Sequence, residues 1–212
     1  MSTSVDTAPL LSALREVSFP TLGHFLEDGF CSPAIRSMVD GGRMVGFAAT
    51  ALVPDADAVA VNQAILRLHP GEVLVLDMGG DRAHAPVGSV TVAAARSRGA
   101  CGILIDGPVT DVLELNDPTV AAPLPVFARG ATCLTTKRRS SGRAQFGIQV
   151  SIDGITVRPG DLVLGDANGV VVLAPQEAAA VVRQALDSDR AEPEILRRIA
   201  SGEPLEDILF TG

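Results

Sequence analysis

The run of residues 74–114 constrains the fold more than any other part of the sequence. It begins inside a continuously apolar segment (72–78), passes through a glycine-containing loop and a short helical segment that runs to Ser97, and enters a second apolar segment at 101–105. Short apolar runs of this kind are typical of strands that are covered on both faces. The order strand, helix, strand predicts one βαβ unit, because parallel neighbours need such a crossover.

The remaining chain predicts an α/β fold with a mixed core sheet, a β-rich second half and terminal helices. Helices are expected at residues 8–17, 20–28, 58–68, 89–97, 176–187 and 193–200, and strands at 44–53, 72–78, 101–105, 124–128, 146–152, 155–157, 162–164 and 170–173. We therefore expect one domain over residues 1–212, with N-terminal helices within 8–28, a core at 44–174 and C-terminal helices within 176–202. The polar, basic segment 132–145 predicts a surface loop or a tether to a neighbouring subunit.

Composition excludes several classes of function. The 212 residues carry a formal net charge of −8 and contain neither Trp nor Tyr. A basic face for phosphates and aromatic stacking platforms are thus not expected, so we predict no nucleic-acid partner. Three cysteines without a CxxC pair, no basic N-terminal leader and no long apolar run predict a cytoplasmic protein with no membrane partner.

The first predicted ligand-facing loop, residues 79–91, follows the strand at 72–78. Gly79 and Gly80 let the chain leave the strand sharply, and Gly88 permits close approach of a ligand to the main chain. The helix that starts at Ser89 offers unpaired N–H groups, which suit a carboxylate or a phosphate. An ordinary capped helix start would give the same pattern.

The second loop follows the strand at 101–105 and carries carboxylates. Asp106 and Gly107 end the strand, and Asp111 and Glu114 follow. Ligands of open α/β sheets bind outside the carboxyl ends of strands, so this loop should face the first one. One or two carboxylates with water and substrate oxygens suit Mg²⁺. In the alternative reading, Asp106 caps a turn while Asp111 and Glu114 are solvated.

The motifs of these two loops resemble those of the RraA-like proteins and class II 4-hydroxy-4-methyl-2-oxoglutarate (HMG/CHA) aldolases. The resemblance rests on GSVTVAAARSRGACGILIDGPVTDVLE at residues 88–114, on LPVFARG at 124–130 and on GDLVLGDANGVVVLAPQEA at 160–178. It implies an α/β/β sandwich that forms a homotrimer or hexamer with its site at the subunit interface. It also implies a small 2-oxo acid as substrate and a divalent cation, Mg²⁺ or Mn²⁺, as cofactor.

The same resemblance assigns roles by position. Asp111 corresponds to the metal ligand and Glu114 to the acid that follows it. The substrate-binding loop corresponds to Gly88, Ser89, Val90 and Thr91. Two positions depart from the family pattern, because Thr110 stands where an arginine holds the substrate carboxylate and Ser89 stands where an acid is usual. Threonine lacks a guanidinium fork, and serine cannot act as a carboxylate base at neutral pH.

Other residues near the predicted site are candidates to replace the missing groups. Arg82 in the first loop and Arg129 after the strand at 124–128 are candidates to bind a carboxylate, and His84 is a candidate acid or base. The leading hypothesis is a metal-dependent carbon–carbon lyase, of aldolase or decarboxylase type, that acts through a pyruvate-like enolate with an altered substrate or reaction. The alternative is a catalytically silent RraA-like trimeric protein that binds or regulates a partner.

Overall fold

The computed structural model describes residues 6–120 and 123–210 and divides into two compact units. The larger unit is Glu27–Pro175, and the smaller one combines Met1–Leu26 with Gln176–Gly212. The expectation of one domain over residues 1–212 stays a prediction. Within the described residues, no helix is long and apolar enough to cross a membrane.

The larger unit is built on a mixed sheet, as the sequence predicts. Among the described residues the sheet has eight strands, in the order β1-β5-β4-β3-β2-β9-β10, with β6 paired to β2. Strands β2 to β5 are parallel to their neighbours in that series, while β1, β6, β9 and β10 pair in antiparallel fashion. The strands are β1 (Arg36–Ser37), β2 (Met44–Leu52), β3 (Glu72–Asp77), β4 (Gly102–Ile105), β5 (Val126–Ala128), β6 (Gln145–Phe146), β9 (Leu162–Asp166) and β10 (Gly169–Leu173).

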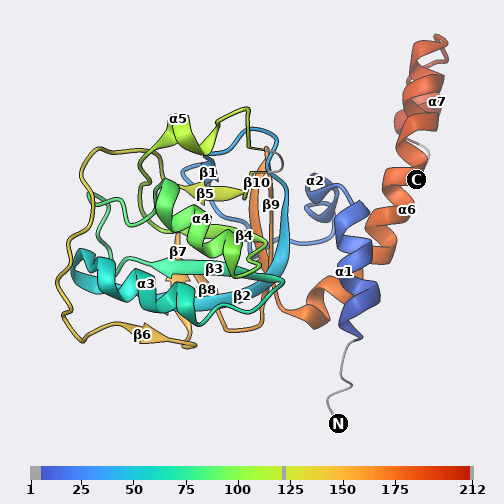
Figure 1. The fold of residues 1–212 in the computed structure, drawn as a ribbon. Helices are drawn as coiled ribbons and strands as arrows, with labels where there is room; N and C mark the ends of the chain where they lie inside the picture. Colours follow the sequence, from blue (N-terminus) through green and yellow to red (C-terminus); the bar gives the residue numbers. More distant parts are fainter. Residues whose placement is uncertain (1–5, 121–122, 211–212) are drawn as a thin grey trace. The chain divides into compact units, whose positions relative to one another are not determined.

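Both faces of the sheet are covered, which explains why β3 and β4 are apolar throughout. Helices α3 (Ala58–Leu66) and α4 (Ser89–Ser97) cover one face, where Leu74 and Ile103 are buried. The hairpin of β7 (Val150–Ile152) and β8 (Ile155–Val157) covers the other face, over Val75 and Leu104. Figure 1 shows this layering of helices, sheet and hairpin, which confirms the predicted α/β fold with a mixed core sheet.

One predicted strand, 146–152, is corrected. The structure divides it into β6, which pairs with β2, and β7, which pairs with β8 in the second sheet. Gly147 has a φ of 64° between them, a left-handed conformation that turns the chain out of the first sheet. The apolar alternation of this segment therefore marks two strands of different sheets.

A long segment after β5, which we call the crossing segment (residues 131–141), runs along the carboxyl ends of the parallel strands (Figure 1). It contacts in turn the loops that follow β4, β3 and β2. The backbone hydrogen bonds are Thr132 N–H to Val109 O (2.9 Å), Ala85 N–H to Leu134 O (2.8 Å) and Lys137 N–H to Ala56 O (2.9 Å). The basic stretch predicted as a surface loop thus forms part of the edge where the site was expected.

The smaller unit consists of α1 (Thr7–Glu16), α2 (Phe19–Leu22), α6 (Pro175–Ala200) and α7 (Glu206–Leu209). Asp189 of α6 accepts hydrogen bonds from Ser18 N–H (2.7 Å) and Thr21 Oγ1 (2.5 Å), which fixes α2 against α6.

Two predicted helix boundaries in this unit are wrong. The second helix ends at Leu22 rather than residue 28, and Gly23 is its C-cap. The separate C-terminal helices expected at 176–187 and 193–200 are one helix, α6, with Pro193 inside it. An interior proline removes one hydrogen bond, but alanine and long charged residues on both sides of Pro193 have high helix propensity.

Candidate functional site

The two loops predicted to face each other do meet, at the N-terminus of α4. A pocket of about 180 Å³ lies there and is closed by the start of α3 and by the crossing segment. Of the predicted site residues, the pocket is lined by Gly88, Val90, Thr91, Thr110 and Asp111. The crossing segment adds Thr135 and Thr136, and α3 adds Asn62, so most of the polar groups around the pocket are neutral.

Asp111 is the acid at the centre of this arrangement. Its Oδ2 accepts hydrogen bonds from Ser89 N–H (2.9 Å) and Ser89 Oγ (3.1 Å), and its Oδ1 accepts one from Thr110 Oγ1 (3.1 Å). The backbone of Asp111 is left-handed, with a φ of 59°, which turns its carboxylate back toward α4. The carboxylate therefore caps the N-terminus of α4 from another loop.

Gly88 permits this approach. A Cβ atom at position 88 would lie 2.4 Å from Asp111 Oδ2 and 2.7 Å from a side-chain carbon of Thr110. Any larger residue would push the Asp111 carboxylate away from the helix. The sequence predicts that Gly88 allows close approach of a ligand, and in the structure that approach is made by Asp111 itself.

The electrostatics keep Asp111 charged. The hydrogen bond from Ser89 N–H lowers the pKa of the Asp111 carboxyl most, partial burial opposes this, and the Ser89 and Thr110 hydroxyls lower the pKa further. All three donors are neutral, so none of them cancels the negative charge. Asp111 is an ionised carboxylate whose charge is available to a ligand.

The start of α4 also keeps free donors. Only the first N–H of the helix, that of Ser89, is used by Asp111, and within the described residues the N–H groups of Val90 and Thr91 have no acceptor. The Val90 side chain is 81% exposed and leaves the backbone accessible. These N–H groups at the positive end of the helix dipole suit a carboxylate.

The donor set fits a divalent cation of the hard type. One ionised carboxylate, the Ser89 and Thr110 hydroxyls and room for water match the way in which Mg²⁺ is bound in proteins. Glu114 lies on α5 (Val112–Leu115) and lines a neighbouring cavity of about 530 Å³, which Ser89 also lines. No group of three or more potential ligand side chains is found among residues 6–120 and 123–210.

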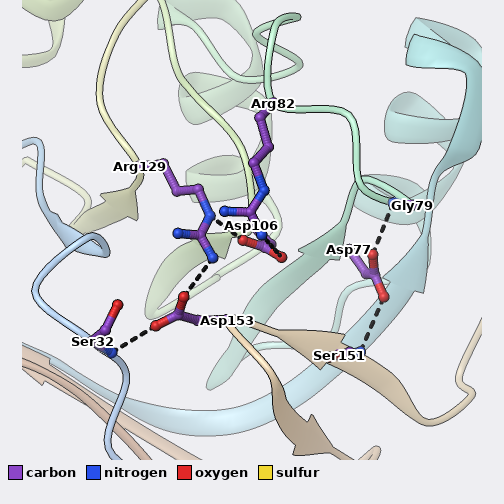
Figure 2. Close-up of polar contacts among 8 residues, drawn as sticks. All are labelled: Ser32, Asp77, Gly79, Arg82, Asp106, Arg129, Ser151 and Asp153. Atoms are coloured by element: carbon purple, nitrogen blue, oxygen red, sulfur yellow. Dashed lines mark hydrogen bonds and ion pairs between the residues drawn. The ribbon is translucent and has the colours of Figure 1, made fainter.

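Arg129 belongs to a second cluster, shown in Figure 2. Its Nε donates to Asp106 Oδ1 after β4, and its Nη2 donates to Asp153 Oδ1 (2.5 Å) in the β7–β8 turn. The second oxygen of Asp153 accepts a hydrogen bond from Ser32 N–H (2.6 Å). All three charged side chains are nearly buried; Arg129 is 11% exposed. We call Arg129, Asp106 and Asp153 the arginine cluster.

Arg82 reaches the edge of the same cluster. Its Nη2 lies 3.5 Å from Asp106 Oδ2, and its side chain is 52% exposed (Figure 2). This is a long, solvated ion pair, so the Arg82 guanidinium keeps donors for another anion. Neither Arg82 nor Arg129 lines the Asp111 pocket.

His84 is held by a neighbouring acid. Its Nδ1 lies 2.7 Å from Asp81 Oδ2, while Asp81 Oδ1 accepts the N–H groups of Ala83 (2.8 Å) and His84 (3.1 Å). A carboxylate on Nδ1 fixes the orientation and the tautomer of the ring and leaves Nε2 for proton transfer. The next residue, Ala85, lines the Asp111 pocket, but His84 does not.

Asp57 connects the start of α3 to the crossing segment. As an N-cap of the helix that follows, it accepts a hydrogen bond from Val59 N–H (2.9 Å). It also accepts from Ser140 N–H (3.1 Å) and Ser141 N–H (2.7 Å), which ties the crossing segment to α3. Burial acts to raise the pKa of Asp57, but these backbone donors bring it below its usual value.

Comparisons with known proteins agree with this fold and these motifs. The model of the family described as RraA-like, Aldolase/RraA, matches residues 14–172. A protein of Halalkalibacterium halodurans named "Putative 4-hydroxy-4-methyl-2-oxoglutarate aldolase" is 32% identical over 151 residues, which are 71% of this chain and 69% of that protein. A relative of the same name in Albidiferax ferrireducens is 39% identical over 49% of this chain and 57% of its own length.

Comparison with solved structures also finds proteins of similar fold. An uncharacterized protein from Pseudomonas syringae pv. tomato superposes with a TM-score of 0.79 at 28% identity, over 98% of this chain and 100% of that one. The structure titled as the RNA-processing inhibitor RraA from Thermus thermophilis superposes with a TM-score of 0.60 at 23% identity, over 81% of this chain and 94% of that one, and supports the fold alone. By its motifs, its fold and its relatives, this chain belongs to the RraA-like family, Aldolase/RraA.

Proposed function

We propose that this chain is a carbon–carbon lyase of aldolase or decarboxylase type, which acts on a small 2-oxo acid through a pyruvate-like enolate. The observation that carries the proposal is the Asp111 carboxylate, which is ionised, faces the pocket at the start of α4 and has only neutral hydrogen-bond donors. The names of several relatives support the aldolase reading.

Asp111 would hold the divalent cation, Mg²⁺ or Mn²⁺, with the Ser89 and Thr110 hydroxyls beside it. Such an ion, when bound, supplies a Lewis acid for the keto oxygen of the substrate. Glu114 would contribute from the neighbouring cavity through water, because its side chain lines a different cavity from Asp111.

The chain's own groups would bind the rest of the substrate. The N–H groups of Val90 and Thr91 would hold the 2-oxo acid carboxylate, and Gly88 keeps the main chain open to it. The Thr110 hydroxyl already donates its one proton to Asp111, so it can only accept a hydrogen bond from the substrate, and it cannot stabilise an enolate as a guanidinium does. Thr135, Thr136 and Asn62 also line the pocket and would offer neutral polar groups to the rest of the substrate.

The contacts favour Arg82 over Arg129 as the cation that replaces the missing arginine. Arg129 is bound to two carboxylates, whereas Arg82 has one long ion pair and is half exposed. His84, held by Asp81, is our candidate for proton transfer. Both side chains lie in the loop that leads into the pocket at Ala85.

We further propose that the assembled form is a homotrimer or a hexamer, with the pocket completed by a neighbouring subunit. Val90 is 81% exposed at the pocket, and Leu113, on the helix that follows Asp111, is 86% exposed. Exposed apolar side chains beside a polar pocket are typical of an interface.

A second candidate is a catalytically silent RraA-like protein that binds or regulates a partner. Two positions favour it, since Ser89 and Thr110 stand where the aldolases have an acid and an arginine. Losing one preorganised charge at a developing oxyanion lowers turnover by a factor on the order of 10² to 10³. The fold does not require turnover, because Asp111 also caps α4.

The test is pyruvate release from 4-hydroxy-4-methyl-2-oxoglutarate and from oxaloacetate, with Mg²⁺ or Mn²⁺ and with EDTA. Turnover that needs the cation and is lost in Asp111→Asn supports the lyase. Turnover by the Ser89→Asp/Thr110→Arg double variant alone would reject the family reaction for the native chain and favour the silent protein. Equal activity of the native protein and Asp111→Asn would show that Asp111 is not part of the catalytic site.

A further inference from the structure

The main sheet is interrupted on one side of β2. Strand β9 pairs with the first part of β2, as far as Phe47 opposite Leu162, and β6 pairs with its end, from Ala51 opposite Phe146. Two different strands thus share one edge of β2 and leave a gap between them. The backbone hydrogen bonds at the borders of the gap include Gly160 N–H to Ala48 O (3.0 Å) and Ala48 N–H to Asp161 O (2.7 Å) on one side and Gly147 N–H to Thr50 O (2.9 Å) on the other.

A cavity of about 320 Å³ lies at this gap, and we call it the notch. Its apolar lining includes Ala49 of β2, Ala64 of α3, Leu74 of β3 and Phe146 of β6. The side chains of Ala49 and Ala64 are single methyl groups, and Gly147 and Gly160 have no side chain. These small residues leave the cavity unfilled. An apolar lining of this size is typical of small-molecule sites. The notch shares no lining residue with the Asp111 pocket.

Arg67 provides a fixed cation at the rim of the notch. Its guanidinium carbon lies 4.1 Å from the centre of the Phe146 ring, and its Nη1 donates to Gln63 O (2.8 Å). These two contacts orient the guanidinium over the notch. Among the described residues Arg67 has no carboxylate partner, unlike Arg129, and Glu72 at the same rim is bound to His69 N–H (2.7 Å). The remaining Arg67 donors are therefore available to an anion from outside.

We propose that the notch binds a small apolar monocarboxylate, with its carboxylate on Arg67 and its apolar body against Ala49, Ala64 and Phe146. Arginine suits a carboxylate because its planar fork donates two parallel hydrogen bonds. The proposal is independent of the proposed lyase, since it concerns other residues and needs no turnover.

Benzoate is the probe, and benzamide is its neutral counterpart. Titration calorimetry and ligand-observed NMR on the full chain should show saturable binding of benzoate at millimolar concentrations, with benzamide weaker by about tenfold or more. Arg67→Met keeps the apolar stem over Phe146 and should weaken benzoate by about tenfold or more. Ala49→Val places a larger side chain inside the notch and leaves less room for a ligand, so it should weaken the binding of both benzoate and benzamide. Arg190→Met, at an exposed arginine of α6, is the matched control and should bind as the native chain does.

Several results would overturn the proposal. They are the absence of saturable benzoate binding, equal affinity for benzoate and benzamide, and unchanged affinity in Arg67→Met. A fourth outcome would also overturn it, and it is tested by comparing the assembly state of the native chain and Arg67→Met in sedimentation experiments. If the variant dissociates an assembly that the native chain forms, another copy of the chain occupies the notch and the small-molecule site is rejected.

Discussion

Asp111 and Asp106 both follow the carboxyl end of β4, yet the structure uses them in opposite ways. Asp106 shares Arg129 with Asp153, so its charge is matched by a buried cation. Asp111 has three neutral donors and keeps its charge. In an ion pair most of the electrostatic attraction is already satisfied, whereas an acid with neutral donors still attracts a cation. The comparison supports our proposal that Asp111 is the functional carboxylate and that the arginine cluster has a structural role.

Position 110 also bears on the charge beside Asp111. An arginine there would place a cation directly beside Asp111, while Thr110 donates only a hydroxyl hydrogen bond at 3.1 Å. Ser89, however, stands where the family pattern has an acid, so the two departures together leave the net charge of the site unchanged. We propose that the ionised Asp111 holds a divalent cation and that N–H groups of α4 or Arg82 bind an anionic substrate.

The largest expected effect is on stability, in the arginine cluster. Arg129→Met would leave Asp106 and Asp153 buried without their shared cation, and this should lower the free energy of unfolding by about 3–5 kcal/mol. Urea unfolding followed by circular dichroism measures it. Arg82→Met, on the exposed side of Asp106, is the control and should cost about 0–1 kcal/mol. Equal losses in the two variants would contradict the division between the two aspartates.

The next effect is on function, at Asp111. Asp111→Asn keeps the left-handed backbone, which asparagine tolerates, but removes the charge. Turnover of a 2-oxo acid, where the native chain shows it, should fall by a factor on the order of 10² or more, and Mn²⁺ binding should be lost. Electron paramagnetic resonance of Mn²⁺ provides a readout that does not need turnover. Undiminished Mn²⁺ binding in the variant would place the cation elsewhere.

Gly88→Ala should disturb the same carboxylate sterically. The added Cβ would lie 2.4 Å from Asp111 Oδ2, so the carboxylate must move and the hydrogen bond to Ser89 N–H must lengthen or break. We expect a loss of about 1–3 kcal/mol in the free energy of unfolding, together with weaker Mn²⁺ binding. At Gly80, a nearby glycine, an added Cβ would meet no atom within 4 Å, but the φ of 87° disfavours alanine, so Gly80→Ala tests backbone strain alone.

Local patterns predicted the elements that build this site. The apolar runs predicted β3 and β4, and the start of α4 at Ser89 is confirmed. These features depend on neighbouring residues in the chain, which is why they can be read from it. The same local reasoning placed Gly88, Thr110 and Asp111 in facing loops, and the structure brings them into one pocket.

Long-range partners could not be predicted in the same way. Arg129 was a candidate for substrate binding because it follows a strand, but its partner Asp153 lies in a hairpin far along the sequence. Thr135 and Thr136 reach the pocket because the crossing segment is held by backbone hydrogen bonds to Ala85 and by the contacts of Asp57 with residues 140–141. The helix α6 continues through Pro193, against the expected break, because the residues on both sides of the proline have high helix propensity.

The smallest expected effect is the dependence of stability on pH at Asp111, and it sharpens the comparison of the two aspartates. The pKa of Asp111 is lowered in the folded state, chiefly by Ser89 N–H, so its charged form stabilises the fold. That contribution is present above the unfolded pKa, about 3.9, and is lost as the pH falls through the lower folded value. Native protein should therefore be more stable than Asp111→Asn at pH 7, and the difference should shrink in acid. Urea unfolding at pH 7 and between about pH 3 and 4 measures both. A difference that stays constant across this range would mean that the hydrogen bonds of Asp111 do not depend on its charge, and its place as the uncompensated acid of the pocket would have to be given up.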